Sequence, residues 1–355
     1  MHFDALTLAA VADELNETLR GGRVQQVVLP DAHSIALEVY ANRQRVYLLL
    51  SAHPQASRVH QVEQKPRRGV EKETPLLLLL RKYVRGSRLD SVETPIPFER
   101  VLFLRFDHPQ HGPTTLVAEP MGRLSNLMLL DAGERILDAL RRTHPKEAAL
   151  RPVRPKLLYA PPPPQDKLPP LLDDAAVQEL AQALSVDERL WRVLVQRVAG
   201  VSPTLAREVA WRAAGAADAP AADADPAQVR AVLAELWSLP ETHAWTPGLL
   251  LDDEEGVVGF AAYEAHFSDE FLPVASISQA VAQFYGVAQR DAAGSTDPYA
   301  GMRNGVAALL DRAEERVRRQ LAALAADEPE PGEPERLRTQ AEWLLALSSQ
   351  IQPGQ

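Results

Sequence analysis

Two short polar blocks hold the side chains best suited to recognising another molecule. In the first block, the run Phe98-Glu99-Arg100 places a carboxylate beside a guanidinium just before a strand-like segment. Such a pair can recognise a base edge or a ribose, because the guanidinium donates in a planar fork while the carboxylate accepts. The pair can equally be a surface ion pair worth about 0–1 kcal/mol, and the residues alone favour this simpler interpretation.

The second block is the run Glu119-Pro120-Met121-Gly122-Arg123-Leu124-Ser125-Asn126. Pro120 and Gly122 interrupt two strongly apolar segments, and a glycine inside a strand often marks a close backbone approach by a ligand. Arg123, Ser125 and Asn126 are polar among apolar neighbours. The block is therefore either a ligand contact or a β-bulge whose arginine reaches solvent, and the residues leave both interpretations open.

Two further segments are candidates for contact with an RNA backbone. The run from Val198 to Ala206 resembles a helix-hairpin-helix turn, in which Gly200 permits a tight turn and the next helix offers free N–H groups to a phosphate. Ser202 stands where a second glycine is common, so an ordinary pair of packed helices is the alternative. Arg81 and Lys82 form a basic helix end, which is either a phosphate contact or a solvated face.

Metal and cofactor chemistry find little support in the sequence. His108 and His111 lie beside Asp107, but two histidines and one acid fall short of a convincing metal site. The chain has no cysteine, which excludes disulfides, cysteine-ligated zinc, iron–sulfur clusters and a cysteine nucleophile. It also contains no Walker loop, G-x-G-x-x-G, G-x-S-x-G or H-E-x-x-H motif.

The charge of the 355 residues is unevenly distributed. The net charge is −10 overall, but residues 1–160 carry +5 and residues 161–355 carry −15. A chain polarised in this way could turn one face towards a polyanion. Because +5 is modest, binding to nucleic acid would need clustered arginines rather than bulk charge.

The elements that must position these residues follow from apolar periodicity. Residues 4–20 and 75–85 are predicted helices. Short apolar runs between tight turns predict strands at residues 23–29, 34–40, 46–50, 88–94, 100–107, 114–119, 124–130 and 135–140. This pattern is typical of an antiparallel α+β domain.

A stiff proline spacer, Ala160–Pro164, ends this first unit. Residues 170–240 then read as helical throughout, and strand-like runs return at residues 246–260 and 262–267. We therefore expect the helical block to be inserted into a discontinuous parent domain. After Ser276 the chain is helical again, and a near-heptad from Met302 to Leu324 predicts the start of a coiled coil. A second short helix with Leu337, Ala341, Leu344 and Ile351 follows an acidic turn, and a two-helix cap packed on the domain is the alternative.

Several runs resemble those of the NFACT family, over nearly the whole chain. They are Phe3-Asp4-Ala5-Leu6-Thr7-Leu8, Glu14-Leu15, Gly21-Gly22-Arg23, Leu50-Ser51-Ala52-His53-Pro54, Arg58-Val59-His60, Leu79-Leu80-Arg81-Lys82, Met121-Gly122-Arg123, Ser125-Asn126 and Ser349-Gln350-Ile351. In combination these matches are specific, and the chain is similar to the N-terminal portion of the bacterial RqcH, or FbpA-like, proteins.

The resemblance implies a four-part organisation. Residues 1–165 and 243–290 would form an NFACT-N domain, similar in fold to the N-terminal domain of Fpg/MutM DNA glycosylases. Residues 170–240 would form an inserted helix-hairpin-helix module. Residues 291–355 would begin a coiled coil, with its remainder and the NFACT-R domain absent from this chain.

The resemblance also implies a function. RqcH-like proteins bind obstructed large ribosomal subunits that carry peptidyl-tRNA, and they recruit tRNA, mainly alanine tRNA, for C-terminal alanine tailing. The factor is not itself the peptidyl transferase. The family's aspartate–arginine pair for tRNA recruitment falls on Glu99-Arg100, with an acid one methylene longer. Contacts to the anticodon arm fall on the second block, namely Glu119, Met121, Gly122, Arg123, Ser125 and Asn126, with Pro120 replacing the usual apolar residue.

Three other interpretations stay open. An inactive relative of Fpg/MutM glycosylases shares the expected fold, but His2 stands in place of the N-terminal proline nucleophile. A surface adhesin is disfavoured, since the N-terminus has no basic signal region and Leu76–Leu80 is far shorter than the roughly 20 apolar residues of a spanning helix. An acidic scaffold would bind protein only. We expect a cytoplasmic, non-enzymatic protein without cofactor, metal, small-molecule substrate or membrane partner, which binds tRNA and the large ribosomal subunit.

Overall fold

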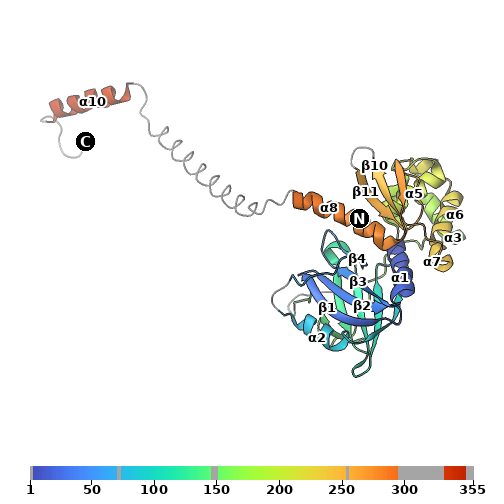
Figure 1. Cartoon of the computed structure of the whole chain (residues 1–355). Helices are drawn as coiled ribbons and strands as arrows, with labels where there is room; N and C mark the ends of the chain where they lie inside the picture. The colour runs from blue at the N-terminus through green and yellow to red at the C-terminus, as the bar shows by residue number, and fades with distance from the viewer. Residues whose placement is uncertain (1–2, 70–72, 145–150, 253–255, 295–331, 349–355) are drawn as a thin grey trace. The chain divides into compact units, whose positions relative to one another are not determined.

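The computed structural model describes residues 3–69, 73–144, 151–252, 256–294 and 332–348. Contacts divide the chain into two compact units, Met1–Gln289 and Arg290–Gln355. The first unit contains the large sheet, a helical block and a smaller sheet (Figure 1). No helix among the described residues is long and apolar enough to cross a membrane.

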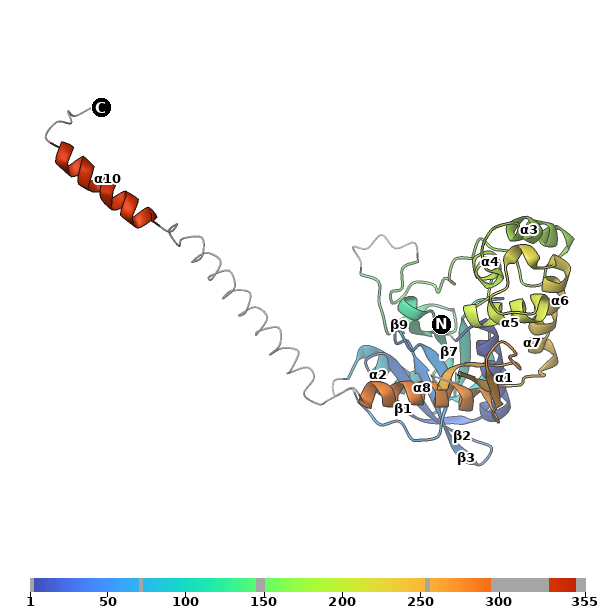
Figure 2. The same ribbon diagram turned by 90° about the horizontal axis from the view of Figure 1, so that it is seen from above.

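Helix α1 (Ala5–Leu19) links two hydrophobic cores of the first unit. The carboxylate of Asp4 caps the helix by accepting a 2.8 Å hydrogen bond from the Thr7 amide. Leu6 packs into the core of the helical block, whereas Leu8 and Val11 pack into the core beside the large sheet. Helix α1 therefore lies between the large sheet and the helical block, as Figures 1 and 2 both show.

Nine antiparallel strands form the large sheet. In pairing order they are β4 (Arg58–Val62), β3 (Gln44–Ser51), β2 (Ser34–Ala41), β1 (Arg23–Asp31), β5 (Arg88–Glu93), β6 (Leu102–His108), β7 (Gly112–Glu119), β8 (Asn126–Leu130) and β9 (Ile136–Ala139). Helix α2 (Pro75–Tyr83) contacts β1 and β9. The α+β class with a large antiparallel sheet is confirmed. The edge strand β4 was not predicted, because its short polar sequence shows no apolar alternation.

The helical block lies between the proline segment and the smaller sheet along the chain (Figure 2). Its helices are α3 (Asp174–Leu184), α4 (Leu190–Arg197), α5 (Pro203–Ala214), α6 (Pro226–Trp237) and the short α7 (Leu239–Thr242). Leu194, Leu205 and Leu233 are fully buried in its core. Helix α4 ends at Arg197, because Val198 already has an extended backbone. The helix-hairpin-helix assignment stays a prediction.

The returning strands form a separate three-stranded sheet. Its order is β11 (Gly256–Ala261), β10 (Gly248–Asp252) and β12 (Glu270–Pro273). The expectation of a strand over residues 262–267 is wrong. There the backbone bonds to side chains of α5: Arg212 donates to the Glu264 carbonyl at 2.7 Å, and the His266 amide donates to Glu208 at 2.7 Å.

Helix α8 (Ile277–Gly294) follows the smaller sheet, and its first residues, including Ala280 and Val281, are buried in the large core. The predicted heptad from Met302 to Leu324 lies outside the described residues. Helix α10 (Glu333–Leu347) belongs to the second unit, and its large apolar side chains are exposed. The coiled coil and the four-part domain division stay predictions.

His60 on β4 makes stability depend on pH. Its ring is 2% exposed, and its Nδ1 has no hydrogen-bond partner among the described residues. Burial, aided by the charge of Arg58, lowers the pKa of His60 from 6.5 to about 3. As pH falls between these values, the unfolded chain binds a proton that the folded chain does not, so protonation favours unfolding.

We expect His60→Leu to make the fall in unfolding free energy below about pH 6 shallower by up to about 1.4 kcal/mol per pH unit. Urea titrations at a series of pH values measure this slope. His33→Leu is the matched control, because its ring is only partly buried. Equal slopes in His60→Leu and the parent protein would show that the buried ring does not carry the effect.

Candidate nucleic-acid interface

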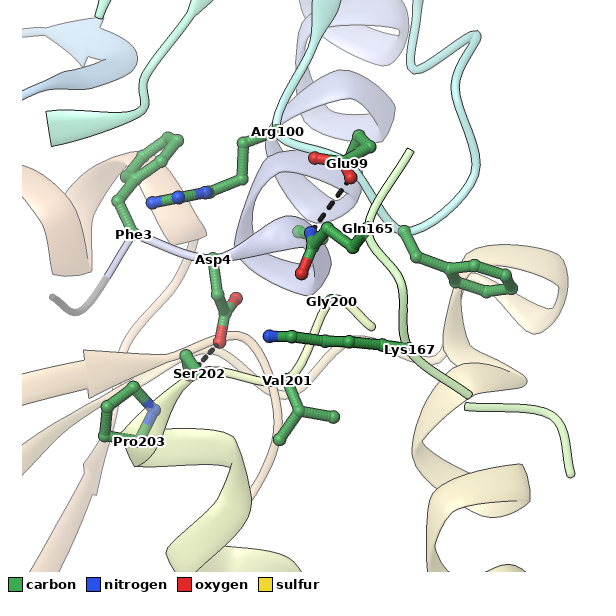
Figure 3. A pocket seen from close by; sticks show the side chains of 12 residues that line it. Phe3, Asp4, Glu99, Arg100, Gln165, Lys167, Gly200, Val201, Ser202 and Pro203 are labelled. Carbon is green, nitrogen blue, oxygen red and sulfur yellow. Dashed lines mark hydrogen bonds between the residues drawn. The ribbon is translucent and has the colours of Figure 1, made fainter. Parts of the chain in front are cut away.

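The residues of the first block, Phe98, Glu99 and Arg100, line a cavity of about 220 Å³ (Figure 3). Glu99 and Arg100 enter it from the segment before β6, while Gly200 and Ser202 enter it from the α4–α5 turn. The structure therefore brings together residues that the sequence placed in two separate candidate groups. Lys167 also lines this cavity and was missed, because nothing in its sequence neighbourhood marks it.

Two helix N-termini meet at the wall of this first cavity. The Ser202 hydroxyl donates to Asp4 Oδ2 at 2.7 Å, and it also accepts from the Leu205 amide at 3.1 Å as the cap of α5. Asp4 in turn caps α1. Ser202 is thus engaged in joining two helices, and this bond accounts for a serine where helix-hairpin-helix turns commonly have glycine.

The charges around Arg100 nearly balance. Its guanidinium is partly buried, and burial lowers its pKa while the charges of Asp4 and Glu99 oppose that shift. An arginine nevertheless stays protonated in proteins. Glu99 accepts a 2.9 Å hydrogen bond from Gln165, as Figure 3 shows. The cavity can therefore offer donors and acceptors together, as recognition of a nucleobase edge requires.

The backbone at Phe98 aims this pair. Phe98 has a positive φ of 61°, which costs about 1–2 kcal/mol for a residue other than glycine. Its ring packs edge-to-face against Trp237 of α6, with centroids 5.0 Å apart. The direction of Glu99 and Arg100 is therefore fixed partly by the helical block.

The second block forms a turn at the edge of another cavity, of about 470 Å³. A single 3₁₀ turn, η1 (Gly122–Leu124), connects β7 to β8. Arg123 is exposed and has no side-chain partner among the described residues, and Leu124 beside it is 80% exposed. Met121 is partly buried at the wall of the same cavity. Arg123 is therefore available to a ligand.

Glu119 plays a different part from the one the sequence indicated. It is 1% exposed and forms a two-pronged ion pair with Arg151, one arm of which measures 2.8 Å. The Tyr159 hydroxyl donates to the same carboxylate at 2.7 Å. Burial opposes the charge of Arg151, but the hydrogen bond and charge of Glu119 outweigh it and raise the pKa of Arg151.

Asn126 and Arg141 hold the turn in place. Asn126 donates to the Arg141 carbonyl at 2.9 Å and accepts from the Arg141 amide at 3.0 Å. The Arg141 guanidinium donates to the carbonyls of Arg123 at 2.6 Å and of Ser125 at 3.2 Å. Gly122 and Ser125 are buried and Met121 is partly buried, so the exposed part of the block is Arg123 and Leu124.

Sequence reasoning missed Arg141 and Arg151, although one signal pointed to a partner. A glutamate between two apolar strands must be buried, and a buried carboxylate needs a cation. That reasoning predicts a partner for Glu119 without saying which arginine supplies it.

The remaining candidates lie elsewhere. Arg81 pairs with Glu73, and neither Arg81 nor Lys82 lines the two cavities. His108 accepts from the amides of Gln110 and His111 and stabilises the β6–β7 turn. Among the described residues no cluster of three or more His, Asp or Glu side chains could hold a metal ion.

Comparison with known proteins assigns the chain to one family. Residues 4–355 match the family model described as "NFACT N-terminal and middle domains", and the chain therefore belongs to the NFACT family. It is 33% identical over 302 residues to the "Rqc2 homolog RqcH" of Bacillus subtilis, covering 82% of this chain and 50% of that protein. The chain thus spans about half the length of this relative.

Solved structures agree on the fold. The N-terminal part of the fibronectin/fibrinogen-binding protein of Streptococcus suis matches with a TM-score of 0.63 and 25% identity, covering 80% of this chain and 99% of that one. The fibrinogen-binding protein of Staphylococcus aureus matches with a TM-score of 0.62 and 22% identity, over 80% and 99% of the two chains. With MutM of Thermus thermophilus the TM-score is 0.28, too low to support any inference.

Gly200 is required by packing, which a substitution can show. A Cβ at this position would lie 2.9 Å from Trp237 Cζ2 and 3.0 Å from the Phe98 carbonyl oxygen, and φ is +72°. We expect Gly200→Ala to lower the unfolding free energy by about 2 kcal/mol or more, measured by urea unfolding. Gly133→Ala is the control, since its Cβ would meet only Asp131 at 3.5 Å. An equal loss in both variants would contradict the packing argument.

Glu119 can be tested as an anchor rather than a ligand contact. Glu119→Gln leaves Arg151 without its buried counter-charge, so we expect a loss of about 3 kcal/mol in unfolding free energy. Glu63→Gln, an exposed glutamate outside both cavities, should leave stability unchanged. Weaker RNA binding with undiminished stability would instead show that Glu119 contacts the ligand directly.

Proposed function

We propose that this chain binds tRNA as part of a ribosome-associated quality control factor. The observation that carries the proposal is the pair of arginine cavities on one compact unit. One holds Glu99 and Arg100, and the other presents Arg123 on a turn that Arg141 holds. Planar guanidinium forks recognise base edges and phosphates, and unpaired loop nucleotides are where proteins usually read RNA.

Membership of the NFACT family supports this proposal, as does the likeness to the Bacillus subtilis protein named as an Rqc2 homologue. In this proposal the chain binds obstructed large ribosomal subunits and tRNA, with alanine tRNA as the expected cargo for alanine tailing. Residues 170–240 would act as a helix-hairpin-helix module, and residues 291–355 would begin a coiled coil. The chain would act as an adaptor and not as an enzyme.

The residues of the two blocks would divide the work. Arg100 and Arg123 would contact tRNA directly, together with Glu99, Met121 and the backbone of Gly122. Glu119, Ser125 and Asn126 are buried, and they would support binding indirectly by holding the Arg123 turn in place. Arg81, Lys82, Gly200 and Ser202 remain secondary candidates for contact with the RNA backbone.

A second candidate function comes from the solved relatives, whose titles describe fibronectin- or fibrinogen-binding proteins. Binding of immobilised fibronectin by the purified chain, together with a large pool at the cell surface, would favour an adhesin. A glycosylase relative would excise bases from damaged duplex DNA, and we expect no excision. Sequencing the RNA that co-purifies with the chain separates the candidates. Enrichment of one tRNA supports the proposal, whereas a pool that matches total RNA favours a scaffold.

The two arginines give the sharper test. We expect Arg100→Ala and Arg123→Ala each to weaken tRNA binding about tenfold, because a guanidinium–base contact is worth about 1–3 kcal/mol. Fluorescence anisotropy at a fixed salt concentration measures the dissociation constants. Arg67→Ala removes an exposed arginine that lines neither cavity and should bind like the parent. Unchanged affinity in both test variants would remove the proposed interface.

A further inference from the structure

Helix α8 covers the open edge of the large sheet. Strand β4 is an edge strand of this sheet, and the backbone amide of Gln61 donates to the Ser278 hydroxyl at 2.9 Å. The Ser278 amide in turn donates to Glu14 of α1 at 2.9 Å. A helix that covers an edge strand keeps it from pairing with another chain. The first turn of α8 is therefore fastened to both β4 and α1.

A second contact joins α8 to β4 two helical turns further on. The guanidinium of Arg58 lies over the ring of Tyr285, 4.5 Å from its centroid. Ser278 and Tyr285 are seven residues apart, which is about 10 Å along a helix. Arg58 and Gln61 are three residues apart, which is about 10 Å along a strand. Helix α8 therefore runs beside β4 in the opposite direction, and the spacing of its two contacts matches that of the strand.

Arg58 is a costly residue for simple packing. Its side chain is 7% exposed, its Nε has no hydrogen-bond partner, and no carboxylate forms an ion pair with it in the part of the chain that the structure describes. Burial lowers the pKa of Arg58, and only the charges of Tyr285 and Asp31 oppose that shift. Its Nη1 donates to the Ala56 carbonyl at 2.7 Å. An apolar side chain would fill the same space at a lower desolvation cost, so packing alone does not account for the arginine.

The residue before Arg58 contacts the turn that carries Arg123. The buried Ser57 hydroxyl accepts a hydrogen bond from the Gly122 amide at 3.3 Å. Gly122 has a φ of +62° and begins the η1 turn, so its backbone sets the direction in which Arg123 leaves the surface. Because Ser57 and Arg58 are consecutive, a displacement of Arg58 also displaces the acceptor of this hydrogen bond.

We propose that Arg58 and Tyr285 are positioning residues, whose contact sets Ser57 and through it the turn that presents Arg123 to a ligand. This inference rests on the proposed function and deepens it, since it makes the seating of α8 on β4 a control on ligand affinity. Helix α8 continues past Gln289, where the first unit ends. A change that lifts α8 from β4 therefore weakens binding at the turn without contact with the ligand.

Hydrogen exchange of the whole chain, measured by mass spectrometry, tests the positioning directly. Tyr285→Leu keeps apolar volume but removes the ring. We expect the amides of residues 121–125 to exchange about fivefold faster or more in this variant, because the Gly122 hydrogen bond opens more often. Tyr285→Phe keeps an aromatic ring over Arg58 and should exchange like the parent. Val27→Ala is the control, since it trims a buried side chain of the same core on β1 and should leave this segment unchanged.

Transfer RNA binding shows whether the position of the turn matters to a ligand. We expect Tyr285→Leu and Ser57→Ala each to raise the dissociation constant about fivefold, measured by fluorescence anisotropy at a fixed salt concentration. The double variant should bind no more weakly than either single variant, because both changes break the same chain of contacts. Urea unfolding checks that each variant is folded under the binding conditions.

Three outcomes would overturn the positioning role. They are unchanged exchange of residues 121–125 in Tyr285→Leu, an equal increase in Val27→Ala, and losses of affinity that multiply in the double variant. If the parent chain binds no tRNA, the proposed function fails, and the exchange measurement still decides whether Tyr285 sets the turn.

Discussion

The buried ion pair between Glu119 and Arg151 fixes the local structure next to the turn that carries Arg123. Glu119 ends β7 just before the turn that exposes Arg123, and Arg151 comes from the segment that follows β9. The same guanidinium bonds to Ala160 and so fixes the start of the proline segment. One arginine thereby links the end of β7 to the start of the proline segment. Removing either partner would leave a charge buried alone, which proteins rarely tolerate.

This arrangement separates the exposed residues of the second block from the buried residues that hold the turn in place. Two polar side chains of the second block are buried: Asn126 is hydrogen-bonded to the backbone of Arg141, and Ser125 is fully buried. Only Arg123 and its neighbour Leu124 project freely. A short sequence block thus contains both an exposed arginine and the buried side chains that hold its turn in place.

Much of the architecture could be predicted from the sequence, because apolar periodicity and turn residues report local conformation directly. The helix of residues 4–20 and the strands around Leu37, Leu104 and Leu129 appear where alternation and turns placed them. The alternation of apolar residues over 262–267 wrongly predicted a strand. The backbone of this segment bonds to the side chains of Glu208 and Arg212 and not to a neighbouring strand. Partners such as Arg151 and Arg141 could not be predicted, because they are distant in sequence and no local pattern encodes the pairing.

The left-handed backbone of Phe98 links the two layers of the molecule mechanically. The Phe98 ring packs against Trp237 of α6, so the helical block helps to fix the backbone that directs Arg100 into its cavity. The Arg123 turn is held differently, by Arg141, which donates to the Arg123 carbonyl, and by Ser57, which accepts from the Gly122 amide. The orientation of Arg100 is therefore coupled to the position of α6 through a single aromatic contact between Phe98 and Trp237.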